Sequence, residues 1–198
     1  MSYFVTAIST DSGKSVVSAL LASVLGYKYW KPVQAGHPTD TDFIKEFDSK
    51  IEVSPERYLL STPCSPHESA KIDNVQISLD DFVRPEGDYI IEGAGGVAVP
   101  INYKGDLMLD LIQKLEVSVV IVSNTYLGSI NHTLLTIEAL KNKKIPIHGI
   151  VFNGEKNEGT ESIILKSTQV PFLFRLQPEK KVNSSLVSKY SEVIKSKF

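Results

Sequence analysis

Residues 6 to 15 read TAISTDSGKS and end in a glycine, a lysine and a hydroxyl residue, namely Gly13, Lys14 and Ser15. This order is typical of a phosphate-binding loop. Backbone amides of such a loop wrap a phosphate, the lysine reaches the β- and γ-phosphates, and the hydroxyl ligates Mg²⁺. The first glycine of the pattern is missing: Ala7 lies at this turn instead, and alanine fits there if the local φ is negative. We therefore predict a nucleotide-phosphate site.

Charged residues follow two later apolar runs. Lys31 lies in YWKPVQAG, and Glu92 lies in DYIIEGAGG just before a glycine-rich turn. A carboxylate at a strand end beside a phosphate loop is typical of a Mg²⁺ site, and burying Glu92 requires a countercharge that Mg²⁺ or a lysine supplies. Asp40 and Asp42 in TDTDF are further candidate Mg²⁺ ligands, although an aspartate before an apolar stretch also caps helices.

The stretch NTYLGSINHT combines a glycine turn with a helix start near Ser129 or Asn131. Free amides at a helix start attract a carboxylate or a phosphate. The residues alone favour an ordinary capped helix over a ligand site, and His132 is interpreted as a structural residue.

The elements that must position these residues alternate along the chain. Continuous apolar runs indicate strands buried on both faces, as in a parallel sheet, and they occupy residues 3–7, 27–33, 88–94, 117–123, 147–153 and 170–176. Helical patterns occupy residues 13–26, 105–116, 130–144 and 184–198, whereas residues 34–87 are less regular. We predict one α/β domain over residues 1–198, with an open, mostly parallel sheet flanked by helices, as in P-loop NTPases. Its ligands should lie beyond the carboxyl ends of the strands.

Composition narrows the class of function. The net charge is only −2 and the basic residues are scattered, so no nucleic-acid partner is expected. The longest apolar run, residues 117–123, is far shorter than the roughly 20 residues of a membrane helix, so no membrane role is expected. A single cysteine, Cys64, and an N-terminus without a secretion signal predict a cytoplasmic protein.

Taken together, these motifs resemble the dethiobiotin synthetase family. The resemblance rests on the order and spacing of YFVTAISTDSGKS, KPVQAG, SPHES, IIEGAGG, LGSINHTLLT and GIVFN across residues 3 to 153. It implies a homodimer and an ATP- and Mg²⁺-dependent ligase. In that reaction 7,8-diaminononanoate takes up CO₂ as a carbamate, ATP phosphorylates the carbamate to an anhydride, and the second amine closes the ring and releases phosphate.

The resemblance also assigns roles to residues. It implies that Lys14, Lys31 and Thr10 are catalytic, and that Ser15, Asp42 and Glu92 hold Mg²⁺, with Asp42 preferred to Asp40. The nucleotide would contact Asp11, Ser12, Gly13, Lys14, Ser15 and Asn153. The substrate would contact Thr10, Lys31, Ala35 and Gly95, with its carboxylate at Ser129, Ile130 and Asn131 of the neighbouring subunit.

The sequence departs from the family pattern at several positions. Asp11 stands where the family has glutamate, and Ala35 replaces a hydroxyl residue near the substrate. Gly154 replaces an acidic residue after Asn153, and residues 170–178 match the base-contacting loop of the family poorly. Selectivity for ATP over other nucleoside triphosphates therefore does not follow from the resemblance.

Two other functions remain open on the sequence. A nucleotide switch of the partition or septum-positioning kind shares this loop but usually has a lysine early in it, and residues 8–12 contain none. A cobyrinate-type ATP-dependent ligase would need a source of ammonia, and no glutaminase-like segment is present.

Overall fold

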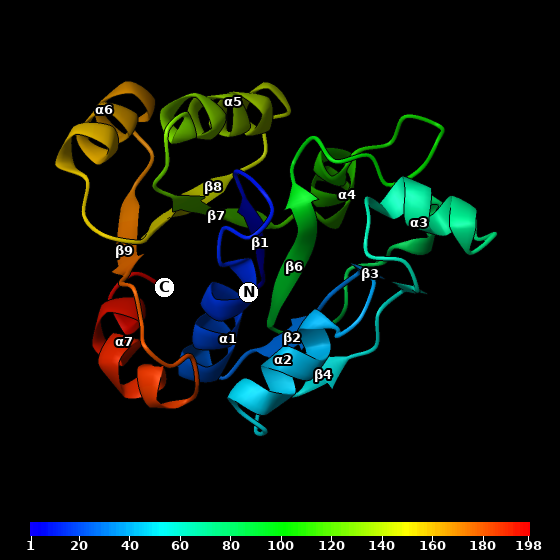
Figure 1. Ribbon diagram of the computed structural model, residues 1–198, viewed down its shortest axis with the longest axis horizontal. Helices are drawn as coiled ribbons and strands as arrows, with labels where there is room; N and C mark the ends of the chain where they lie inside the picture. Colours follow the sequence, from blue (N-terminus) through cyan, green and yellow to red (C-terminus); the bar gives the residue numbers. More distant parts are fainter.

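A seven-stranded parallel sheet organises the chain, which is described over all 198 residues by a computed structural model (Figure 1). The strand order is β4-β2-β6-β1-β7-β8-β9. Their bounds are β1 Tyr3–Ala7, β2 Lys28–Trp30, β4 Val53–Ser54, β6 Tyr89–Gly96, β7 Ser118–Asn124, β8 Ile147–Asn153 and β9 Phe172–Leu176. The predicted fold class is confirmed, and β1 with its phosphate loop occupies the centre of the sheet.

One predicted strand is divided in two. The apolar run at 27–33 forms β2 and then β3 (Val33–Ala35), which leaves the large sheet and pairs with β5 (Tyr58–Leu60). Pro32 separates them, since proline has no amide to continue a ladder. The break places Lys31 directly after β2, whose last residue, Trp30, pairs with Ile91 of the neighbouring strand β6.

Helices cover both faces of the sheet (Figure 1). One face packs against α1 (Lys14–Leu25), α2 (Asp40–Phe47) and α7 (Ser185–Lys195), and the other against α4 (Met108–Leu115), α5 (Ser129–Asn142) and α6 (Glu158–Thr168). The short helices α3 (Pro66–Ile72) and η1 (Leu79–Asp81) lie beside the smaller sheet, and α2 and α6 were not predicted from the sequence. None of these helices has the length and apolar character needed to cross a membrane.

Helix α1 holds the phosphate loop against the sheet. Val17, Leu20 and Leu21 are fully buried in the core on that face. Two glycines with left-handed backbone bound the helix: Gly13 before it with a φ of 89°, and Gly26 after it with a φ of 70°. A side chain would strain both positions, so they set where the helix begins and ends.

Candidate active site

A cavity of about 800 Å³ opens at the carboxyl ends of β1, β2 and β6. Its lining includes most of the residues that the sequence singled out, namely Thr10, Asp11, Gly13, Lys14, Ser15, Lys31, Ala35, Glu92 and Gly95. The single cysteine, Cys64, is exposed and lies at the same cavity. Residues from four separate stretches of chain thus meet where a parallel sheet places its ligands.

Lys14 is a cation without a partner. It is only 8% exposed, and its ammonium group makes no hydrogen bond or ion pair within the chain. Burial lowers its pKa, although nearby Glu92 opposes the shift. A buried ammonium without a bound anion is costly, and the phosphates of a nucleotide would supply the missing charge.

The phosphate loop is anchored to the neighbouring strands through Ser12. This residue is fully buried, and its hydroxyl group donates to Oδ1 of Asn124 at 2.8 Å. Its carbonyl oxygen accepts a hydrogen bond from Nδ2 of Asn153 at 2.9 Å. Asn124 and Asn153 are partners in the register of β7 and β8. Ser12 and Asn153 therefore shape the loop from outside the cavity, and Asn124 is a contributor that the sequence analysis missed.

Lys31 lies between two carboxylates. Its ammonium nitrogen is 2.5 Å from Oδ2 of Asp40 and 3.2 Å from Oε1 of Glu92, and it also donates to the carbonyl oxygen of Gly93. Burial favours the neutral amine, but the two carboxylates outweigh it and raise the pKa of Lys31. Burial likewise opposes ionisation of Asp40, yet Lys31 prevails and lowers its pKa. Lys31 and Asp40 thus form an ion pair at neutral pH.

The acidic residue that faces this cluster is Asp40, and the preference for Asp42 is wrong in this structure. The Ser15 hydroxyl lies 2.8 Å from Oδ1 of Asp40 and 2.9 Å from Oε1 of Glu92. Asp42 instead forms a capping box with Thr39 at the start of α2, and hydrogen bonds from Thr39 lower its pKa. Its carboxylate accepts from the backbone amide and the hydroxyl group of Thr39, and it makes no hydrogen bond with Ser15.

The oxygen atoms of Ser15, Asp40 and Glu92 form a donor set suited to a hard divalent cation. Two carboxylates and a hydroxyl are fewer ligands than a closed metal cage requires, and no group of three or more acidic, histidine or cysteine side chains surrounds a common point. Mg²⁺ usually binds one or two carboxylates and takes its remaining ligands from water and phosphates. The residues present therefore fit a magnesium ion shared with a nucleotide.

The start of α5 lies outside the cavity of its own chain. Ser129 is buried and its hydroxyl group has no hydrogen-bond partner, whereas Ile130 and Asn131 are exposed. The Ser129 amide donates to the carbonyl oxygen of Tyr126, and no carbonyl in the chain accepts from the next two amides. The two amides are thus free of backbone partners, and their residues do not line the cavity.

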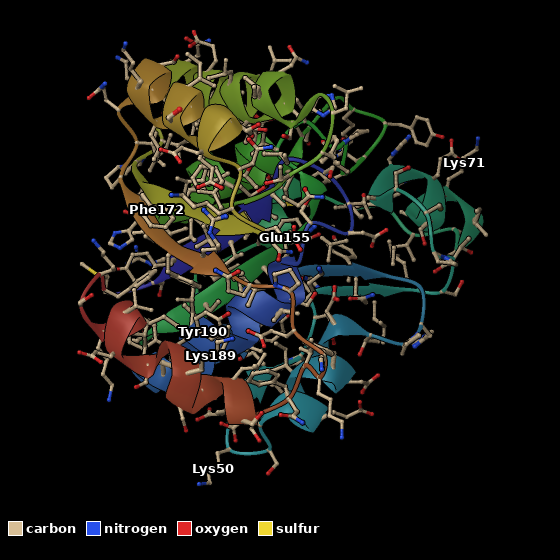
Figure 2. All side chains as sticks on the ribbon, turned by 60° about the vertical axis from the view of Figure 1, so that its left-hand side comes forward. Lys50, Lys71, Glu155, Phe172, Lys189 and Tyr190 are labelled. Atoms are coloured by element: carbon tan, nitrogen blue, oxygen red, sulfur yellow. The ribbon has the colours of Figure 1, made fainter.

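The loops at the ends of β8 and β9 flank the phosphate loop on its other side. Glu155 lies in the first loop and Tyr190 lies on α7, and both are labelled in Figure 2. The Tyr190 hydroxyl accepts from the amide of Gln177 at 3.0 Å and donates to Glu179 at 2.7 Å. Helix α7 thereby fixes the course of the loop after β9, where the sequence departs from the family pattern.

Comparison of the chain with known proteins identifies the family to which it is similar. Residues 1–185 match a family described as AAA domain. The ATP-dependent dethiobiotin synthetase of Cytophaga hutchinsonii is 48% identical over 195 residues, which cover 96% of this chain and 94% of that protein. The enzyme of the same name from Christiangramia forsetii is 42% identical over 203 residues, which cover 100% of this chain and 97% of that protein.

The chain belongs to the ATP-dependent dethiobiotin synthetase family. It is therefore an ATP-dependent ligase, and the resemblance found in its motifs is confirmed. The matches span nearly the whole chain, so they include the phosphate loop, the strand ends around the cavity and α5.

Solved structures of lower identity share the fold. A ParA family ATPase from Chlorobium tepidum has a TM-score of 0.62 at 15% identity, with 99% of this chain and 98% of that chain covered. A putative plasmid partition protein from Borrelia burgdorferi, bound to AMPPNP, has a TM-score of 0.64 at 15% identity, with 100% and 97% covered. Identity this low supports the P-loop fold alone and does not favour a switch function.

Proposed function

We propose that this enzyme converts 7,8-diaminononanoate, CO₂ and ATP into dethiobiotin, ADP and phosphate. The substrate would be carboxylated to a carbamate and then phosphorylated to a carbamic-phosphoric anhydride, whose carbonyl carbon the second amine would attack. The carbon–nitrogen bond that closes the ring forms as the bond to phosphate breaks. The family membership and the meeting of Lys14, Lys31, Ser15, Asp40 and Glu92 at one cavity support this proposal.

The cavity divides this chemistry between its two lysines. Lys14, at the start of α1 and without a partner, would hold the β- and γ-phosphates. Lys31 would turn from its carboxylates to the negatively charged carbamate and the phosphoryl group in transfer. Thr10 would contact the diamine and the phosphate from the loop. Such fixed positive groups act by positioning and by stabilising charge that develops during transfer.

Mg²⁺ would bind at Ser15, Asp40 and Glu92. Bound there with a nucleotide, it would neutralise charge on the β- and γ-phosphate oxygens. The present hydrogen bonds of Ser15 to both carboxylates bring these oxygen atoms together before a cation arrives. Until the cation binds, Lys31 balances the charge of the two carboxylates, which would otherwise repel each other in a buried site.

The active enzyme would be a homodimer in which α5 of the partner completes the substrate site. Large apolar side chains are exposed around this helix, with Leu127 103%, Leu135 60% and Ile130 36% accessible. A second chain packed here would cover them. The unused amides at the start of α5 would then bind the carboxylate of the substrate.

The free thiol of Cys64 suits a reducing compartment, and we expect the enzyme to act in the cytoplasm.

The first test is phosphate release by the purified protein with Mg²⁺, bicarbonate and ATP, measured with and without 7,8-diaminononanoate. We expect release that depends on the diamine, and ¹³C from labelled bicarbonate in the ring carbonyl of the product. The Lys14→Ala variant is the control for contaminating ATPases. Phosphate release that is indifferent to the diamine would contradict the proposal and favour a nucleotide switch. Parallel reactions with CTP and GTP would determine base selectivity.

The shared site can be tested with mixed dimers. Lys14→Ala disables the phosphate loop, and Asn131→Asp places a carboxylate where the substrate carboxylate would bind. Each variant alone should be nearly inactive. Co-expression should restore activity, because one of the two sites in a mixed dimer has an intact loop from one chain and an intact α5 from the other. No recovery in a mixed dimer isolated by two affinity tags would contradict a shared site.

A further inference from the structure

A tyrosine beneath the cavity contacts the carboxylate that the magnesium proposal depends on. Tyr29 lies on β2, is fully buried, and donates from its hydroxyl group to Oε2 of Glu92 at 3.1 Å. Tyr29 does not line the cavity and therefore cannot contact a nucleotide. The carboxylate of Glu92 is the only hydrogen-bond partner of the Tyr29 hydroxyl group.

The two oxygen atoms of Glu92 have separate partners. Oε1 faces the cavity and accepts from Ser15 at 2.9 Å and from Lys31 at 3.2 Å. Oε2 faces the core and accepts from Tyr29. Only the first atom is thus placed to bind a cation together with Ser15.

Strand geometry explains this division. Successive side chains of a strand alternate between faces, so Tyr29 and Lys31 point to the same face of β2. Tyr29 pairs with Ile90 in the register of β2 and β6, which brings Glu92 opposite the end of β2. Tyr29 therefore contacts the carboxylate of Glu92 from the core side, and Lys31 contacts it from the cavity side.

We propose that Tyr29 is a positioning residue that holds Glu92 with Oε1 directed at the metal site, a role that rests on the proposed Mg²⁺ binding by Ser15, Asp40 and Glu92. The side chain of Glu92 is buried, and only its contact with the cavity brings it near solvent. Without the phenol, Oε2 would have no donor, and a buried charged group without a donor is destabilised. The carboxylate would then rotate to share Lys31 and Ser15 between its two oxygens, which disturbs the ligand geometry.

The test is the Tyr29→Phe variant, which removes one oxygen atom and keeps the ring that fills the core. ADP affinity is measured by calorimetry in Mg²⁺ and again in EDTA, and the ratio of the two affinities reports metal coupling. We expect this ratio to fall by about tenfold or more, as the loss of a hydrogen bond to a charged group predicts, while the affinity in EDTA stays unchanged. Mn²⁺ titrations followed by electron paramagnetic resonance, with ADP present, should show weaker binding by a similar factor.

The matched control is Tyr58→Phe. Tyr58 also donates to a carboxylate, Asp81, and is also largely buried, but it does not line the cavity or contact Glu92. This variant should keep the wild-type coupling ratio. Thermal unfolding of both variants shows whether each remains folded at the temperature of the titration.

Three outcomes separate the alternatives. A wild-type ratio in Tyr29→Phe, measured on folded protein, would overturn the positioning role. An equal fall in Tyr29→Phe and Tyr58→Phe would assign the effect to general loosening of the fold and would also overturn it. If the wild-type protein itself showed no coupling between Mg²⁺ and ADP, the proposed metal site would fail, whatever the variant did.

Discussion

Lys31→Met would remove the cation between two carboxylates while keeping the length of the side chain. The side chains of Lys31 and Glu92 are 5% and 0% exposed, so water cannot replace the lost charge beside Glu92. The side chain of Asp40 is 31% exposed, so water partly screens its charge. Breaking a buried ion pair costs about 3–5 kcal/mol, and the exposure of Asp40 points to the lower end. A loss of about 3 kcal/mol in a domain of this size lowers the Tm by roughly 6–12 °C.

The loss should depend on pH. Lys31 lowers the pKa of Asp40 below its ordinary value of 3.8, so the ion pair stabilises the fold at neutral pH and this contribution disappears as the pH falls through the lowered pKa. In the variant Asp40 loses the cation that lowers its pKa and takes up a proton more readily. The difference in Tm between variant and wild type should therefore be largest near pH 7 and should shrink as the pH falls below about 4.

The assay is thermal unfolding by circular dichroism in EDTA across this pH range, followed by phosphate release at pH 7.5. The control is Lys28→Met, which removes an exposed lysine of β2 that pairs with Glu52. Exposed pairs contribute little, so this variant should unfold near the wild-type temperature and remain active. Equal unfolding temperatures for the two variants, or diamine-dependent turnover in Lys31→Met, would refute the reasoning.

Further predictions concern the two aspartates and the phosphate loop. Asp40→Asn should raise the Mg²⁺ concentration needed for half-maximal activity by at least tenfold. Asp42→Asn should weaken the helix cap and lower the Tm by a few degrees, while the Mg²⁺ requirement stays unchanged. The opposite pattern in magnesium titrations would show that Asp42, and not Asp40, belongs to the metal site. Gly13→Ala should weaken ADP binding more than tenfold by calorimetry, because its new methyl group would lie 2.4 Å from Asn153 Nδ2 and displace the loop. Gly26→Ala has a similar φ and open space, so it should lose stability yet bind ADP normally; equal ADP affinity in both glycine variants would disprove the clash argument.

Strong local patterns carried most of the fold prediction. Apolar runs predicted β1, β6, β7, β8 and β9 because a strand buried on both faces must be apolar throughout. Helix α1 was equally clear from its apolar stripe and its terminal Gly26. The split at Pro32 was missed, because β2 and β3 are adjacent in sequence and diverge only through pairing with different strands.

The choice between Asp40 and Asp42 shows where the sequence reasoning erred. A family pattern placed the acidic ligand at Asp42, but Thr39 stands three residues earlier and forms a capping box with it. That spacing is visible in the sequence and assigns Asp42 to the helix start. With Asp42 assigned to the cap, Asp40 is the carboxylate that remains for the metal site.

The phosphate loop, the parallel α/β class and the family could be predicted from the sequence, because each depends on residues that are close together or on motifs in a fixed order. The meeting of distant groups could not be predicted in this way. The hydrogen bond from Tyr29 to Glu92, the contact of Ser12 with Asn124 and the ion pair of Lys31 with Glu92 join residues that lie 61 to 112 positions apart. Such contacts depend on strand order and on the face to which each side chain points, and neither is encoded in local spacing.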